Sequence, residues 1–276
     1  VWGGSGASLP SKLQLELIQD LKPTIFMGMS SYGLHLANLA AAQGVDLPGG
    51  TVNRVLCTAE PVSTAKRSRL ERDWGAEVFD CFGMTECSMM GAESEAHDGF
   101  HVWTDLAFIE VLDEETMKPV GEGEPGVLVT TPLFSNNGAA FLRWNSGDIV
   151  SWERQGLTKS GYSVFPMVRH AHRTAGFFKI RGTNINHQEY EDFLFDIPEV
   201  NDFKAELVTL EDGTDSFELS IEVRAKADAS IVAGQVAKAT KTTFDVTPDV
   251  SVLELGTLAK EFETSVKAPR FADKRE

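Results

Sequence analysis

Residues 82–86 bring a glycine, a hydroxyl and a carboxylate together where an apolar run ends. Gly83 permits a tight turn. Thr85 and Glu86 follow it, and they could hold a phosphate and its Mg²⁺, a hard cation that prefers oxygen ligands. The same spacing also fits a helix start, with Thr85 as the cap and Glu86 at the positive end of the dipole. On spacing alone, the helix start is the better interpretation.

Three further residues could take part in chemistry on a nucleotide. Asp148 follows a turn and could accept hydrogen bonds from a ribose diol, although a turn aspartate more often bonds its own backbone. Arg173 stands where the sequence pattern changes, and an isolated arginine is more often a surface ion pair. Lys267, in the tail, could bring a positive charge to a transferring phosphoryl group, or could simply be solvated.

Composition indicates a folded protein and excludes some partners. The chain has 276 residues, is 42% hydrophobic and carries a formal net charge of -16. Because nucleic acids and anionic membrane surfaces repel an acidic protein, neither is an expected partner. No apolar run reaches membrane-spanning length and no signal peptide opens the sequence, so we expect a cytoplasmic protein.

The cysteines and histidines predict neither a disulfide framework nor a metal centre. Cys57, Cys81 and Cys87 are few and odd in number, which is typical of reduced thiols. No pair of cysteines has the Cys-x-x-Cys spacing of structural zinc sites, and the histidines are scattered.

The elements that must position these residues are those of an α/β protein. Helical spacing covers residues 13–21, 34–44 and 63–74, and strand-like runs cover residues 24–28, 52–57 and 77–82. Strands that alternate with helices predict a parallel sheet with flanking helices over residues 1–100. Because ligands bind at the carboxyl ends of such strands, residues 59–61 and 83–86 are well placed for a site.

The rest of the chain predicts two further units. Short strands over residues 107–112, 126–131 and 148–153 predict a small β-barrel-like subdomain over residues 101–172. Residues 173–276 predict a smaller, mobile C-terminal α+β domain of a common size. Its expected helices cover residues 188–195 and 231–242, its strands residues 177–180, 205–210, 217–223 and 250–255, and a polar tail follows.

The candidate residues occur in an order that resembles a known family. The series comprises residues 59–61, 82–86, 143–148, Arg173, residues 180–184 and Lys267. It resembles the adenylate-forming superfamily of acyl-CoA synthetases, adenylation domains and luciferases, and most of all its phenylacetate–CoA ligase branch. The resemblance extends over essentially the whole chain.

The resemblance implies a role for each of these residues. Thr85 would contact phosphate and Glu86 would hold Mg²⁺, while Asp148 and Arg173 would bind the ribose. Lys267 would stabilise the transition state of adenylation, and Gly182 would let the thiol arm of coenzyme A pass close to the backbone. Ala59, Glu60 and Pro61 would line the adenine, with Phe82 stacking nearby, and Gly83 would also belong to the nucleotide-binding residues.

A pocket for the acid is also implied. It would involve Tyr32, Met84, Met89 and Met90, whose apolar or aromatic character suits an aryl or arylacetic acid. A plain buried core explains these residues equally well.

The expected activity is therefore ATP-dependent activation of a carboxylic acid to an acyl-adenylate, followed by transfer to coenzyme A. The family's phosphate loop has no equivalent here, so we expect this chain to be the C-terminal portion of the enzyme and incomplete in activity. Two alternatives stay open: transfer to a carrier-protein thiol or an amine, and a non-catalytic nucleotide-binding fragment or scaffold. The expected partners are the acid, ATP and coenzyme A, with a homodimer left open.

Overall fold

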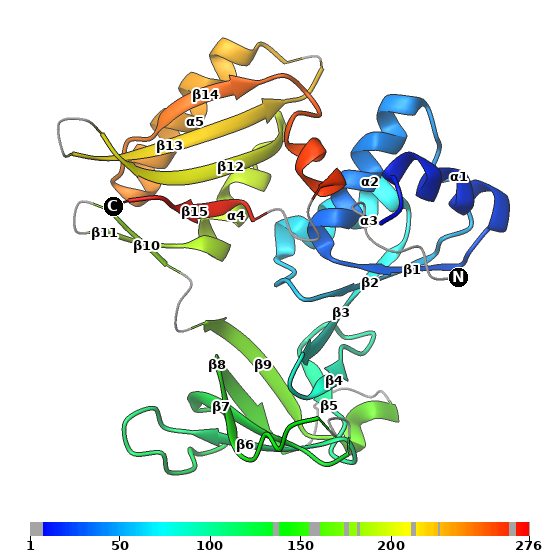
Figure 1. Ribbon diagram of the computed structural model, residues 1–276, viewed down its shortest axis with the longest axis vertical. Helices are drawn as coiled ribbons and strands as arrows, with labels where there is room; N and C mark the ends of the chain where they lie inside the picture. The colour runs from blue at the N-terminus through cyan, green and yellow to red at the C-terminus, as the bar shows by residue number, and fades with distance from the viewer. Residues whose placement is uncertain are drawn as a thin grey trace.

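The structure is a computed structural model that describes residues 8–134, 138–154, 161–173, 177–180, 183–210, 214–225, 227–264 and 269–275. Within these residues the chain forms a mixed α/β fold with one large and one smaller sheet, and a separate two-stranded hairpin (Figure 1). None of the helices in these segments is both long and apolar enough to cross a lipid bilayer. The α-helices are α1 (Ser11–Leu21), α2 (Ser30–Gln43), α3 (Thr64–Trp74), α4 (His187–Phe195) and α5 (Ala229–Phe244).

The first part of the chain alternates helices with parallel strands, as the sequence predicts. Strand β1 (Ile25–Gly28) pairs in parallel with β2 (Arg54–Thr58), which pairs in parallel with β3 (Glu77–Met84). Helix α2 ends at Gly44, whose φ of 71° is a left-handed conformation that suits glycine. Helix α3 begins after Ser63, whose hydroxyl accepts a hydrogen bond from the Lys66 N–H. The cap at Gly44 thus ends α2 before the chain enters β2, and the cap at Ser63 starts α3 after the chain leaves β2.

The large sheet is mixed, and its strands form one continuous sheet rather than two. Six strands extend it beyond β3, in the order β4, β5, β9, β8, β7, β6. The expected β-barrel-like subdomain is therefore not a separate sheet. The six strands are β4 (Ser88–Ala92), β5 (Phe100–Val102), β6 (Ala107–Leu112), β7 (Pro125–Pro132), β8 (Trp144–Glu153) and β9 (Met167–Arg173).

The sheet nevertheless curls back on itself. Thr130 on β7 lies 2.9 Å from the Cys87 sulfur, measured from its Oγ1, and 3.9 Å from the Met84 sulfur. Strand β7 is several places away from β3 and β4 in the strand order, so these contacts close the curl. A buried cluster fills the interior, with Met90, Phe100 and Val168 among its members. The barrel-like character predicted from the short strands is thus present as curvature.

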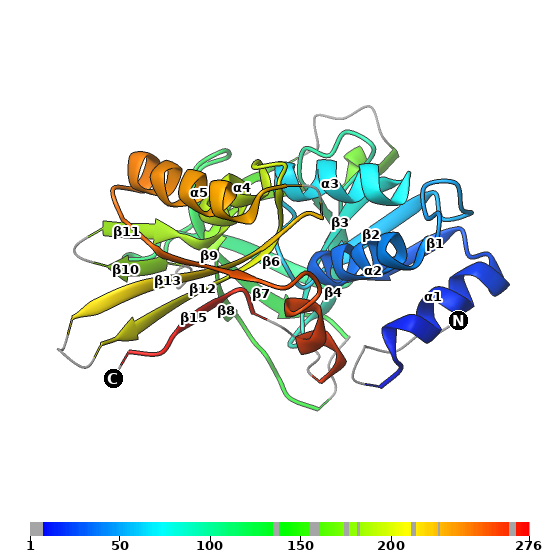
Figure 2. The same ribbon diagram turned by 90° about the horizontal axis from the view of Figure 1, so that it is seen from above.

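A smaller C-terminal sheet follows, with α4 and α5 packed on one of its faces (Figure 2). Tyr190 on α4 is fully buried there, and its hydroxyl lies 3.1 Å from Thr240 Oγ1 on α5. The sheet has the order β14, β13, β12, β15, where β12 is Val200–Thr209, β13 is Asp215–Val223, β14 is Asp249–Leu253 and β15 is Phe271–Asp273. The hairpin of β10 (Phe177–Ile180) and β11 (Thr183–Asn186) precedes it.

Helix α3 of the first part lies against the C-terminal sheet and its helix α4. The Arg69 guanidinium on α3 donates to the backbone oxygen of Asn201 on β12 over 2.6 Å. The same guanidinium lies over the ring of Phe195 at the end of α4, 5.2 Å from its centroid. Helix α3 and the C-terminal sheet are therefore in direct contact through a buried cation, with the 3-10 helix η2 (Leu258–Glu263) close by (Figure 1).

Strand β1 forms one edge of the large sheet. Among the described residues it pairs only with β2, and the side chains of Ile25 and Met27 are about half exposed, at 52% and 54%. Parallel sheets are normally covered on both faces.

Candidate nucleotide-binding site

The segments that follow β1, β2 and β3 gather at one edge of the sheet because parallel strands end on the same side. Glu60, in the segment after β2, bonds to the start of α2, which follows β1. Its carboxylate accepts hydrogen bonds from the Ser30 hydroxyl at 3.0 Å, from the Ser31 N–H at 2.9 Å and from the Ser31 hydroxyl at 2.8 Å. Glu60 therefore fixes the segment of residues 59–61, which is predicted to line adenine, to the amino end of α2.

The charge of Glu60 is stabilised where it lies. Burial alone raises the pKa of this carboxyl, but Lys66, Arg270 and the bonds from Ser31 together lower the pKa below its ordinary value. Ala59, the preceding residue, has a φ of 67° and is exposed, as is Pro61. Ala59 and Pro61 thus remain accessible, whereas the Glu60 carboxylate is occupied by the protein itself.

Residues 82–86 do not begin a helix. Strand β3 continues through Met84, a turn covers residues 85–87, and the chain returns as β4. Gly83 is required here because a Cβ at this position would lie 2.6 Å from the Ser88 carbonyl oxygen. The helix-start interpretation of this segment is wrong, since an antiparallel hairpin occupies its place and leaves Thr85 exposed at the tip.

The hairpin tip and the segment after β2 are neighbours. The Thr58 hydroxyl, at the end of β2, lies 3.8 Å from the Met89 sulfur on β4. Phe82 is partly buried and lies 5.3 Å from Phe100, between ring centroids. Residues 59–61 and 82–86, which are far apart in sequence, therefore flank the same edge of the sheet.

Asp148 and Arg173 are brought opposite each other by strand pairing. They are register partners between β8 and β9. Asp148 is buried at 5% exposure, and its N–H donates to the Ser146 hydroxyl over 3.0 Å. The two residues that were predicted to bind one ribose thus lie directly opposite each other on paired strands. The Arg173 side chain itself lies outside the described atoms.

The four residues predicted for the acid pocket are distributed over two cores. Met90 is fully buried with Phe100 and Val102, and Met84 packs against the same cluster. Tyr32 belongs to the other core, where its hydroxyl accepts a hydrogen bond from the Gln14 side chain at 2.7 Å. Met89 is half-buried beside Thr58. Met89 and Met84 are thus the members nearest to the hairpin tip.

Lys267 and Gly182 lie outside the described residues, so the structure does not place them. A magnesium ion at Glu86 can be considered from the donor set. Within the described segments, no group of three or more His, Cys, Asp or Glu side chains could hold a metal. Mg²⁺ in phosphate sites commonly takes one or two carboxylates together with phosphate oxygens and water, and Glu86 with Thr85 fits that pattern.

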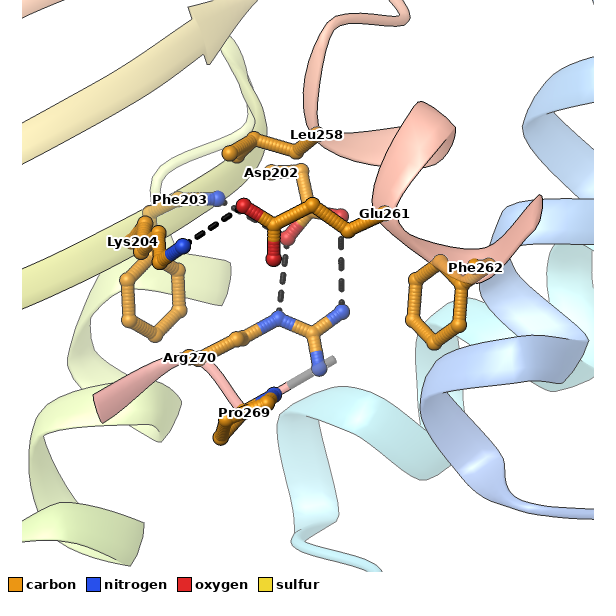
Figure 3. A pocket seen from close by; sticks show the side chains of 8 residues that line it. All are labelled: Asp202, Phe203, Lys204, Leu258, Glu261, Phe262, Pro269 and Arg270. Carbon is orange, nitrogen blue, oxygen red and sulfur yellow. Dashed lines mark hydrogen bonds and ion pairs between the residues drawn. The ribbon is translucent and has the colours of Figure 1, made fainter. Parts of the chain in front are cut away.

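A buried charge network, which the sequence does not predict, lies beside Glu60. Lys66 on α3 is 2% exposed and pairs with Glu191 on α4 over 2.8 Å. Arg270 pairs with Glu191 over 3.4 Å and with Asp202 over 2.9 Å. Arg270 lies in the segment before β15, and Asp202 lies on β12. Figure 3 shows the Arg270 guanidinium directed at the Asp202 carboxylate. The only sequence signal for this network is that Arg270 follows Lys267 by three residues.

A second buried group lies beneath the segment of residues 59–61. Asp80 on β3 accepts a hydrogen bond from the Cys81 N–H at 2.9 Å, and its neighbour Glu93 pairs with Arg67 at 2.8 Å. Burial and the charge of Glu93 raise the pKa of Asp80 to about 7. The backbone of Val62, just beyond Pro61, acts in the opposite direction and lowers the pKa of Asp80.

Comparison with known proteins places this geometry in context. Residues 3–131 match the family described as AMP-binding enzyme. A phenylacetate-coenzyme A ligase of Thermus thermophilus is 30% identical over 215 residues, which cover 76% of this chain and 47% of that protein. A phenylacetate-coenzyme A ligase of Pseudomonas putida is 26% identical over 271 residues, which cover 95% of this chain and 60% of that protein. The chain thus spans about half the length of these relatives.

Solved structures of one relative show two arrangements. The chain matches 2-hydroxyisobutyryl-CoA ligase in the postadenylation state, in complex with 2-HIB-AMP, with a TM-score of 0.80 at 25% identity, over 96% of this chain and 57% of that one. The match to the same enzyme with 2-HIB-AMP and CoA in the thioesterification state has a TM-score of 0.59, over 100% of this chain and 59% of that one. The arrangement of this chain is closer to the former.

Proposed function

Because the chain belongs to the adenylate-forming, AMP-binding superfamily, we propose that it forms the nucleotide-binding and C-terminal part of an AMP-forming acid–thiol ligase. The observation that carries this proposal is that residues 59–61 and the hairpin of residues 82–86 follow neighbouring parallel strands at one end of the sheet, where Thr58 lies 3.8 Å from the Met89 sulfur. Both segments stand at the carboxyl ends of neighbouring parallel strands, which is where α/β sheets bind nucleotides.

The reaction proceeds in two steps. The carboxylate oxygen of the acid attacks the α-phosphorus of ATP, the bond to the β-phosphate oxygen breaks, and pyrophosphate leaves. A thiolate of coenzyme A then attacks the acyl carbon, and AMP leaves with the electron pair of the broken C–O bond. Charge grows on the phosphoryl oxygens in the first step, so cationic groups must converge there.

Each residue at the carboxyl ends of these strands has a separate role in the two steps. Ala59, Pro61 and Phe82 line the adenine. Glu60 holds the segment of residues 59–61 in place by its hydrogen bonds to Ser30 and Ser31. Asp148 accepts hydrogen bonds from the ribose hydroxyls. Thr85 donates to a phosphate oxygen. Glu86 would hold Mg²⁺, which would neutralise charge on the phosphates.

An aryl or arylacetic acid is the proposed substrate class. Two relatives are named phenylacetate-coenzyme A ligases, and the sulfurs of Met84 and Met89 lie close to the hairpin tip. Flexible thioether side chains pack well against aromatic rings. The relative named as a 2-hydroxyisobutyryl-CoA ligase marks an aliphatic acid as the alternative substrate.

Two other functions predict different outcomes of the same assay. Transfer to a carrier-protein thiol or an amine keeps the first step and changes only the acceptor. A non-catalytic nucleotide-binding fragment keeps neither step. Pyrophosphate exchange into ATP that depends on an added carboxylic acid reports the first step, and the acceptor is then identified by adding coenzyme A, a carrier protein or an amine to the acyl-adenylate.

The decisive variant is Lys267→Ala, with Lys260→Ala as its control from the exposed surface of η2. In the protein that carries this chain, Lys267→Ala should reduce acid-dependent pyrophosphate exchange at least 100-fold, because a cation at the reacting phosphate is lost. Thiol transfer from a preformed acyl-adenylate should continue. Absence of any exchange in the unaltered protein would overturn the ligase proposal.

A further inference from the structure

The contact between α3 and α4 contains a buried ion pair that joins the two parts of the chain. Lys66 Nζ lies 2.8 Å from Glu191 Oε2 and donates a hydrogen bond to the Pro61 carbonyl over 3.2 Å. Lys66 therefore touches both the segment predicted to line adenine and a helix of the C-terminal part. No solvent separates these groups, since the Lys66 side chain is 2% exposed and that of Glu191 11%.

Glu191 passes this contact on to the segment before β15. Its other carboxylate oxygen, Oε1, lies 3.4 Å from Arg270 Nη1. Arg270 also donates to both carboxylate oxygens of Asp202, over 2.9 and 3.4 Å (Figure 3). Its guanidinium lies 5.2 Å from the ring centroid of Phe195. Arg270 is consequently fixed on several sides, and Lys66 reaches it through one shared carboxylate.

The Lys66–Glu191 pair of this network forms only when the two parts are together. The first part contributes Glu60 and Lys66, and the C-terminal part contributes Glu191, Asp202 and Arg270. Buried charges are tolerated when each has a partner, and removal of one partner leaves a charge that is costly to bury. Separation of α3 from α4 would leave Lys66 without Glu191, so the network favours the arrangement seen here.

That arrangement matches the postadenylation state of the relative more closely than its thioesterification state, with TM-scores of 0.80 and 0.59. The position of the network in sequence is also informative. Arg270 follows Lys267 by three residues, and three residues of extended chain span at most about 11 Å. An anchored Arg270 thus limits how far Lys267 can reach.

We propose that Lys66 and Glu191 are positioning residues for the adenylation half-reaction, acting through Arg270. They hold the C-terminal part in the arrangement that delivers Lys267 to the phosphates, and they are not needed once the acyl-adenylate has formed. This inference rests on the proposed function, but the interface it describes can be tested without catalysis.

The first experiment measures the arrangement itself. Spin labels are attached at Gln43→Cys on α2 and Lys238→Cys on α5, both exposed, while the native cysteines are buried. We expect a narrow distance distribution by pulsed electron resonance. Lys66→Met, which removes the charge but keeps an unbranched side chain only one atom shorter, should broaden this distribution, and Lys66→Arg should keep it narrow. The control Arg72→Met, on the exposed face of the same helix, should leave it unchanged. A Lys66→Met distribution equal to that of the unaltered protein would overturn the proposal.

The second experiment separates the two half-reactions in the protein that carries this chain. Lys66→Met and Glu191→Gln should each lower acid-dependent pyrophosphate exchange by about tenfold, consistent with the loss of a charge-assisted bond. Thiol transfer from supplied acyl-adenylate should stay within twofold, and Lys66→Arg should recover most of the exchange. Equal loss of both half-reactions would indicate a purely structural role and would refute positioning. If the unaltered protein shows no exchange, the proposed function fails, and the distance measurement still decides whether the interface exists.

Discussion

Asp148 and Arg173 are cross-strand partners, opposite each other in the antiparallel pairing of β8 with β9. Their separation in sequence is bridged by a strand, a 3-10 helix and another strand, so neither residue alone signals the other. The pairing places Asp148 at a buried position in the sheet with its N–H bonded to Ser146. This relationship supports a shared role on one ligand.

Asp148→Asn should raise the ATP concentration needed for half-maximal pyrophosphate exchange by about tenfold or more. A charge-assisted hydrogen bond contributes roughly 1.5–3 kcal/mol, which corresponds to that range. The ATP dependence of exchange at saturating acid measures the effect. Asp113→Asn, in an exposed turn away from this site, is the control and should not alter the ATP requirement. An Asp148→Asn protein with an unchanged ATP requirement would count against the ribose assignment.

Glu60→Gln should lower the free energy of unfolding by about 1–3 kcal/mol at neutral pH, because it weakens three hydrogen bonds to a partly buried carboxylate. Urea denaturation of the chain measures the change. Glu16→Gln, on the exposed face of α1, should stay within about 0.5 kcal/mol of the unaltered protein.

The pH dependence of this difference has a definite sign. The pKa of Glu60 is lowered in the folded protein, so its stabilisation is present above the unfolded pKa and is lost as the pH falls through the folded one. The gap between the unaltered protein and Glu60→Gln should therefore shrink below a pH of about 4. A gap that stayed constant into strongly acidic solution would show that the carboxylate charge is not stabilising.

Asp80 predicts the opposite trend. Its pKa is raised to about 7 by burial and by Glu93, so the folded protein holds a proton that the unfolded chain releases near pH 4. Stability should accordingly decrease, by at most about 1.4 kcal/mol per pH unit, as the pH rises between these values. Asp80→Asn should remove this slope, whereas Asp20→Asn on exposed α1 should retain it. If the free energy of unfolding changed equally with pH in the unaltered protein and in Asp80→Asn, from pH 4 to 8, this assignment would be contradicted.

The acid pocket can be separated from the core by two neighbouring methionines. Met90→Ala should destabilise the chain by about 2–5 kcal/mol, because Met90 is fully buried in the curled sheet. Met89→Ala should cost less stability and should change the relative exchange rates with arylacetic and aliphatic acids. Thermal unfolding and exchange rates with both acids give the two readings. Unchanged acid preference in Met89→Ala would remove Met89 from the pocket.

Much of the first part of the fold follows from local sequence. The expected helix over residues 63–74 is α3, and the expected end near Gly44 is the left-handed cap of α2. These elements carry strong local signals, namely apolar spacing and a cap residue. The strand over residues 107–112 matches β6 for the same kind of reason.

Features that depend on distant residues were not predictable in the same way. Thr85 and Glu86 fit either a helix start or a hairpin tip in sequence, and the pairing of β3 with β4 determines that the hairpin forms. The expected polar tail contains β15, whose partner β12 lies more than sixty residues earlier. The Lys66–Glu191 pair likewise joins helices of different parts, so no local pattern announces it. The candidate site residues stand out in the sequence as an ordered series and remain a prediction. The contacts that hold them, such as those of Glu60 with Ser30 and Ser31, could be seen only in the folded chain.

The uncovered edge at β1 has a consequence for how this protein behaves in concentrated solution. Among the described residues β1 pairs on one side only, with β2, so its other side, beside the exposed Ile25 and Met27, is a template on which another strand can add. Opposing this is a net charge of -16, which makes copies of the chain repel one another. The repulsion is screened by salt, whereas backbone hydrogen bonding at the edge is not. Colloidal stability of the isolated chain should therefore depend on ionic strength, with low salt keeping the molecules apart and high salt allowing their edges to meet.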